Sequence, residues 1–172
     1  MALGAEQIPM NKYIPAYVIL GLLFAMIAAT VAEWTANRQY KRAAMLLGLA
    51  KIDWKSSAMS EALLLVMKNQ GKAFMFNDYQ GRVKGIEIHV FTWSRDVAFW
   101  SKRRTCAVLK HFDASPLPEN LVALLNERAA ADVTIQPNWI IIQSQTKVAA
   151  TDLGRWLETI ADAVQGSVVK PS

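Results

Sequence analysis

The residues best suited to chemistry are His89, His111 and Cys106, with Asp113 close by in the sequence. If the segments that carry the two histidines pair as strands, the imidazoles can face one another, as a metal site would require. Zinc needs three or four ligands held tetrahedrally, and strand alternation does not bring Cys106 to the same side as both histidines. We therefore predict no metal and no cofactor, and we interpret Cys106 as a small core residue.

Local catalytic motifs of the common kinds are absent. The chain has no GxxxxGK[ST], GxGxxG, HExxH or GxSxG sequence, and its acidic residues show no spacing that singles out a general acid and base. We predict no catalytic residues and expect the protein not to be an enzyme. A membrane-tethered enzyme, with a site assembled from distant residues, is the alternative.

One segment, residues 93–104, has the composition of a contact surface because aromatic and basic side chains interleave in it. Its candidate contact residues are Trp93, Arg95, Phe99, Trp100, Lys102, Arg103 and Arg104. Aromatic rings and arginines are favoured at protein interfaces, and the same mixture suits lipid headgroups. We predict contact with a protein partner or a headgroup; the alternative is a hairpin that tucks its aromatic side chains under the domain. Binding of single-stranded nucleic acid is not expected in a chain tethered to a membrane.

Alternating and helical patterns after residue 56 predict the elements that position these side chains. The expected helices are 58–69, 119–130 and 152–165, and the expected strands are 73–77, 85–93, 104–112, 133–136 and 139–143. A turn is expected at 78–82, and one face of strand 85–93 is expected to be core. The pattern indicates an α+β domain over residues 56–166, with a mainly antiparallel sheet of about five strands and about three helices.

The hydrophobic excess of the chain is local. Residues 14–32 contain no charged side chain, and as a helix they extend about 28 Å, close to the hydrocarbon thickness of a bilayer. We predict a transmembrane helix over 13–34, preceded by a short tail at 1–12 and followed by a basic helical stalk at 35–55; residues 167–172 are a C-terminal tail. A cleaved signal peptide is the alternative, although its apolar core would normally be shorter.

Aromatic and basic residues flank this predicted span. The candidate interface anchors are Tyr13, Tyr17, Trp34, Arg38, Lys41 and Arg42. Because basic residues stay on the cytoplasmic side, we expect the tail 1–12 outside and the domain in the cytoplasm, with the chain in the inner membrane. The net charge is +5, and much of this excess lies just after the span in a basic collar of Arg38, Lys41, Arg42, Lys51 and Lys55. Anionic headgroups are the expected lipid partners.

Small residues repeat along one side of the predicted span. The candidate packing face consists of Gly21, Ala25, Ala28, Ala29 and Ala32, and small side chains at this spacing let helices approach closely. We therefore expect other integral membrane subunits as partners. The hypothesis is a non-catalytic accessory or scaffold subunit that stabilises or assembles a membrane complex, for example a respiratory or photosynthetic one; a lipid-headgroup or signal-sensing adaptor is a further alternative.

Overall fold

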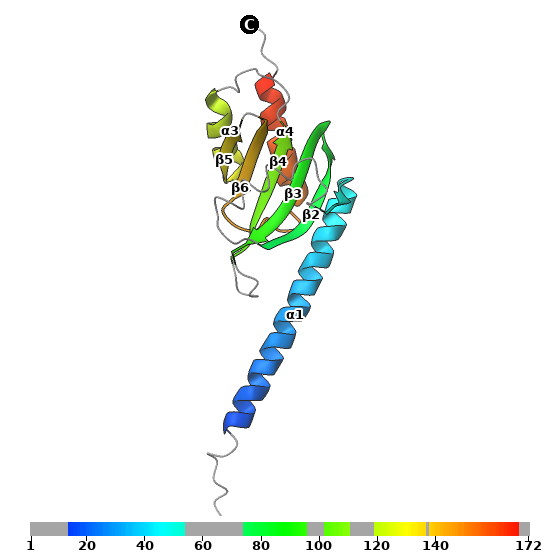
Figure 1. Ribbon diagram of the computed structural model, residues 1–172, viewed down its shortest axis with the longest axis vertical. Coiled ribbons are helices and arrows are strands. Elements are labelled where there is room, and N and C mark those ends of the chain that lie inside the picture. Colours follow the sequence, from blue (N-terminus) through cyan, green and yellow to red (C-terminus); the bar gives the residue numbers. More distant parts are fainter. Residues whose placement is uncertain (1–13, 54–73, 96–101, 111–118, 137, 169–172) are drawn as a thin grey trace, which may run out of the picture. The chain divides into compact units, whose positions relative to one another are not determined.

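The computed structural model describes residues 14–53, 74–95, 102–110, 119–136 and 138–168. They form an α+β fold with three helices and a six-stranded antiparallel sheet (Figure 1). The chain divides into two compact units, Met1–Thr35 and Ala36–Ser172. The expected helix at 58–69 lies outside the described residues.

The first unit contains most of helix α1, Ile14–Leu46. Among the described residues, this helix alone is long and apolar enough to cross a membrane, with a mean hydropathy of 2.0 and none of that stretch buried. Large side chains such as Leu20 and Phe24 are exposed all round it. Its length and composition match both a membrane span and an N-terminal signal sequence.

The last turns of α1 belong to the second unit and differ in character. Tyr40 and Ala44 are 0% exposed and join the main core, because the helical spacing of small and apolar residues here leaves one continuous apolar stripe. The helix ends at Leu46, whereas the helical stalk was expected to continue to residue 55. Gly48, at φ 74°, then turns the chain into the short strand β1, Ala50–Lys51.

The sheet has the strand order β1-β2-β3-β4-β6-β5. The remaining strands are β2 (Phe74–Val83), β3 (Ile86–Ser94), β4 (Arg104–Lys110), β5 (Ala131–Gln136) and β6 (Trp139–Ser144). The expected hairpin of β5 and β6 is confirmed, with Gln136 opposite Trp139. The sheet has one more strand than expected because β1 adds an edge to β2.

The predicted turn at 78–82 is wrong, since these residues lie within β2. A register shift between Phe76 and Tyr79 absorbs an extra residue, and Asn77 has a φ of 52°. The reversal comes later, at Lys84 and Gly85, whose φ values of 50° and 82° suit a two-residue hairpin turn. Residues 78–82 have side chains that favour a turn, but they continue the strand because the bulge takes up the extra residue and β3 pairs along their length.

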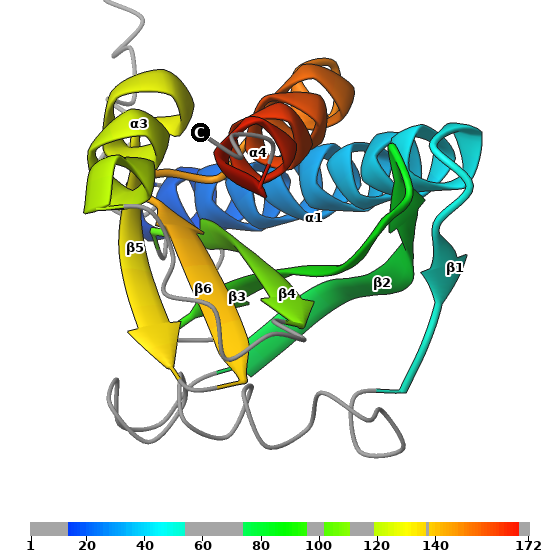
Figure 2. The same ribbon diagram turned by 90° about the horizontal axis from the view of Figure 1, so that it is seen from above.

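Helices α3 (Glu119–Ala129) and α4 (Leu153–Val168) lie on the same face of the sheet (Figure 2), confirming both expected helices. We call this the helix face. The main core forms there from Leu121 and Leu125 of α3, Leu157 and Ile160 of α4, and strand residues such as Ile88. Trp156 of α4 donates from Nε1 to the carbonyl of Ala129, 3.0 Å away, at the end of α3.

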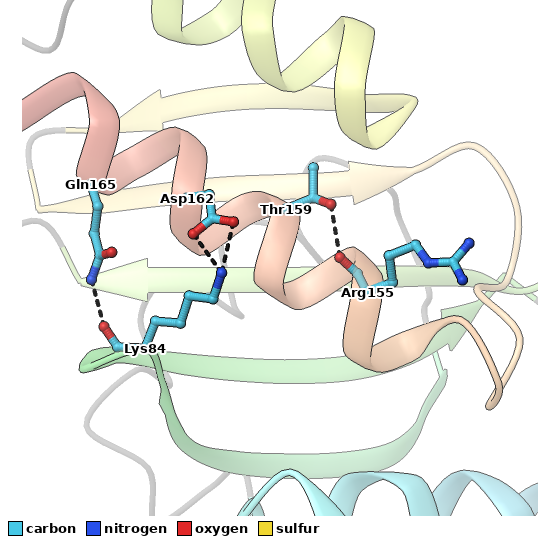
Figure 3. Close-up of polar contacts among 5 residues, drawn as sticks. All are labelled: Lys84, Arg155, Thr159, Asp162 and Gln165. Carbon is cyan, nitrogen blue, oxygen red and sulfur yellow. Dashed lines mark hydrogen bonds and ion pairs between the residues drawn. The ribbon is translucent and has the colours of Figure 1, made fainter.

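The β2–β3 hairpin is tied to α4 at its turn (Figure 3). The ammonium of Lys84 lies 2.7 Å from both carboxylate oxygens of Asp162, and Gln165 donates to the Lys84 carbonyl at 2.5 Å. Because the Lys84 and Asp162 side chains are both substantially exposed, this ion pair contributes at most about 1 kcal/mol. It fixes the position of the hairpin more than it stabilises the fold.

The opposite face of the sheet, which we call the outer face, is also buried. A second cluster forms there from Phe91, Trp93, Cys106, Val108, Trp139 and Ile141. The expectation that one face of β3 is core is confirmed by Ile88 and Val90, and the other face is buried as well. The interpretation of Cys106 as a core residue is confirmed. Strands β3, β4 and β6 each contribute to both clusters, so the middle of the sheet is buried on both faces.

We predict that Gly81→Ala destabilises the fold by about 1–3 kcal/mol. A Cβ atom at Gly81 would lie 2.8 Å from the carbonyl oxygen of Gly48 and 3.0 Å from Leu49 Cα, so the backbone that joins α1 to β1 would have to move. The measurement is chemical denaturation of the full-length chain in detergent. Gly166→Ala is the control, because its Cβ meets nothing within 4 Å and alanine favours a helix by up to about 1 kcal/mol. Equal stability of Gly81→Ala and the parent chain would contradict the close approach.

Candidate functional site

All five residues of the predicted packing face lie on α1, and Ala29 is the one that is half-buried. Gly21, Ala25, Ala28 and Ala32 are exposed, and a Cβ at Gly21 would meet nothing within 4 Å. Tyr17 and Trp34 are exposed near the ends of the apolar stretch, while Tyr13 lies outside the described residues. The unit thus exposes an apolar helix, one side of which carries only small side chains.

The aromatic and basic segment is divided between core and surface. Trp93 is 4% exposed and belongs to the outer-face cluster, so its ring packs inside the domain. Arg103 lies over the Phe76 ring, 4.2 Å from its centroid, and Arg104 is 4.0 Å from Asp132. Arg95 and Lys102 are exposed. Phe99 and Trp100 lie outside the described residues.

A buried acid and base pair, missed by the sequence reasoning, lies on the outer face. His89 is 0% exposed and its Nε2 contacts Oδ1 of Asp78. Because a carboxylate accepts, Nε2 donates and Nδ1 is left as the second ring nitrogen. Neither His89 Nδ1 nor Asp78 Oδ2 has a hydrogen-bond partner in the described part of the chain. The pair is largely buried and joins β2 to β3.

Two buried groups have strongly perturbed ionisation. Burial raises the pKa of the Cys106 thiol, and burial is also the main reason why the pKa of Tyr40 is raised, although nearby Thr105 opposes it. The Tyr40 hydroxyl makes no hydrogen bond of ordinary geometry to the described residues. Both groups stay neutral near pH 7, which suits structural residues and not a nucleophile or a general base.

The second unit also contains an open groove of about 460 Å³ where the end of α1 meets the edge of the sheet. Its basic side chains are Lys41 of α1 and Lys51 of β1, and its other main lining residues are Met45, Leu49, Ala50 and Tyr79. We call this the basic groove. Sequence reasoning named Lys41 as a membrane anchor but did not find the groove, because its lining comes from three elements that only the fold brings together.

The described residues hold no group of three or more histidine, cysteine or acidic residues that is arranged to bind a metal ion. His111 and Asp113, which figured in the sequence-based metal hypothesis, lie outside those residues. Among the described residues, the basic groove is an open site that combines basic and apolar side chains. Its charge and its apolar lining suit binding of an anion that carries an apolar part.

We predict that stability falls as the pH rises above about 9. The folded-state pKa values of Cys106 and Tyr40 lie above their ordinary values of 9.0 and 10.0, so the unfolded chain loses these protons first and alkaline pH favours unfolding. Each group lowers the free energy of unfolding by about 1.4 kcal/mol for every pH unit between its pKa in the unfolded chain and its pKa in the folded chain. In denaturation curves of the full-length chain, Cys106→Ala should remove the loss of stability that starts near pH 9. Tyr40→Phe should remove the loss of stability that starts near pH 10. Unchanged slopes in both variants would contradict the assignment.

Comparison with known proteins adds no relative: no protein-family model, no curated protein and no solved structure matches this chain.

Proposed function

We propose that this protein is a non-catalytic, single-span accessory subunit that stabilises or assembles a larger membrane protein complex. The observation that carries the proposal is the dual character of α1. Its first part exposes apolar side chains all round, and its last turns bury Tyr40 and Ala44 completely in the core of the second unit. One helix therefore serves as anchor and as part of the domain's fold.

The apolar part of α1 needs an apolar surrounding. Its large side chains, among them Leu20, Phe24 and Ile27, are more than half exposed, and such a surface is unfavourable in water. Lipid can cover the bulky sides. The side with Gly21 and Ala25 offers little side-chain surface to lipid, but it allows the backbone of a second helix to approach closely. This division supports a helical membrane partner.

The basic residues that follow the apolar stretch support the proposed orientation. Arg38, Lys41 and Arg42 are exposed on α1, whereas Lys12 is the one basic residue before it. Under the positive-inside rule this difference supports a cytoplasmic second unit and an N-terminal tail on the outside. The proposed location is the inner membrane.

The alternative of a tethered enzyme finds less support among the described residues. His89 and Asp78 would be the natural general base and its orienting acid, but they are 0% and 8% exposed. The basic groove is accessible and is lined by lysine and apolar side chains, a composition that suits holding an anion. Accessory binding is therefore the function that the geometry supports best.

The test is mild-detergent purification of the full-length chain, followed by identification of the proteins that accompany it. We expect one or more integral membrane proteins at a fixed ratio. The variant Gly21→Leu with Ala25→Leu should reduce their recovery at least tenfold, because leucine side chains would hold the helices apart.

Thr30→Leu is the matched control, since Thr30 lies on the other side of the helix and its hydroxyl bonds only back to the Met26 carbonyl at 2.8 Å. Its complex should remain intact. Purification of a lone monomer would refute the accessory role, and an intact complex in the double-leucine variant would refute the packing face.

A further inference from the structure

The basic groove contains three hydrogen-bond donors that are not used by the fold. Within the described part of the chain, Lys41 and Lys51 take part in no ion pair, and Tyr79 makes no side-chain hydrogen bond. Burial raises the pKa of Tyr79, with a further contribution from Asp78, so its hydroxyl keeps its proton. Two ammonium groups and a phenol around one groove are complementary to a phosphate group.

The rest of the groove is apolar, and so is the surface beside it. Met45 and Leu49 contribute to its lining. Met45 is 62% exposed, and its neighbour Leu46 is 89% exposed. Inorganic phosphate would engage the donors but leave this apolar surface in water. An anion that continues into glycerol and acyl carbons would cover it.

We propose that the basic groove binds an anionic phospholipid, with the lipid phosphate between Lys41 and Lys51 and the adjoining carbons against Met45 and Leu49. This inference rests on the proposed function, because it takes α1 to cross a membrane. It goes further by giving one lipid class a defined site on the second unit, where the sequence indicated only a diffuse attraction between a basic collar and headgroups.

The spacing along α1 is compatible with a lipid of the membrane that the helix crosses. Lys41 follows Ala32, the end of the uncharged stretch, by nine residues, which is about 14 Å of helix. The headgroup layer takes up about 5–8 Å of that distance. Lysine side chains on a helix lean toward its N-terminus and extend their charge toward the interface. The Lys41 side chain can therefore span most of the remaining distance to the headgroup layer.

The experiment is native mass spectrometry of the full-length chain from micelles that contain equimolar phosphatidylglycerol and phosphatidylcholine at fixed salt. We expect the parent chain to retain phosphatidylglycerol preferentially. The Lys41→Gln, Lys51→Gln double variant should lower that preference by about 25-fold, at about fivefold for each basic residue lost near a phosphate. The matched control is Arg128→Gln with Arg155→Gln, which removes the same charge from other exposed positions and should keep the preference.

A second variant separates a site from general electrostatic attraction. Ala50→Trp keeps both lysines and fills the groove at an exposed position of β1, so it should also abolish the preference. If Ala50→Trp or the lysine variant still retained phosphatidylglycerol, or if the control lost it equally, the proposed site would be overturned. Displacement of the lipid by 10 mM inorganic phosphate would likewise overturn it in favour of a soluble anion.

The outcomes also distinguish this inference from the proposed function. An intact protein complex without any lipid preference would refute the lipid site and leave the accessory role standing. Lipid retention by a chain that purifies without partners would refute the accessory role and leave the lipid site standing. Loss of a protein partner, instead of lipid, from the lysine variant would assign the groove to an acidic segment of that partner and refute the lipid proposal.

Discussion

The burial of Tyr40 and Ala44 at the end of α1 is the constraint on which the second unit depends. Tyr40 packs against Tyr79 of β2, with ring centroids 6.2 Å apart, and Leu49 follows into the same core. The chain can then return along the edge of the sheet only because Gly81 leaves room for the backbone at Gly48. The basic groove forms at this junction, so the same contacts that complete the core also shape the candidate site.

The two faces of the sheet satisfy their polar groups unequally. On the helix face, Ser144 bonds to both backbone groups of Thr105 at 2.9 Å, and the Thr105 hydroxyl accepts from Val148. On the outer face lie four of the five buried side-chain atoms that lack a hydrogen-bond partner in the described residues: Asp78 Oδ2, His89 Nδ1, Trp93 Nε1 and Gln143 Nε2. Each such atom costs about 1–3 kcal/mol. The outer face therefore carries most of this polar cost, and burial of Phe91, Trp93 and Trp139 on the same face opposes it.

Elements with a strong local pattern could be predicted from the sequence, and contacts between distant residues could not. The apolar stripe of α4 and the alternation in β3 each fix an element by themselves. By contrast, residues 78–82 have the composition of a turn, and only the pairing of β2 with β3 makes them a strand. The His89–Asp78 contact depends on that register. The groove was out of reach for the same reason: Lys41 and Lys51 are separated by a helix end and a tight turn, so their spacing carries no signal of a shared site.

If α1 crosses a membrane and the basic groove binds a lipid, Lys41 serves two purposes with different physical requirements. Membrane orientation depends on the sum of basic residues near the span, and Arg38 and Arg42 contribute to that sum as much as Lys41 does. Binding in the basic groove depends on position, because a phosphate gains from an ammonium group only at close range in a salt solution. Among the three, only Lys41 lines the groove. A chain that needed orientation alone would gain nothing from this placement, so the placement itself favours a bound anion.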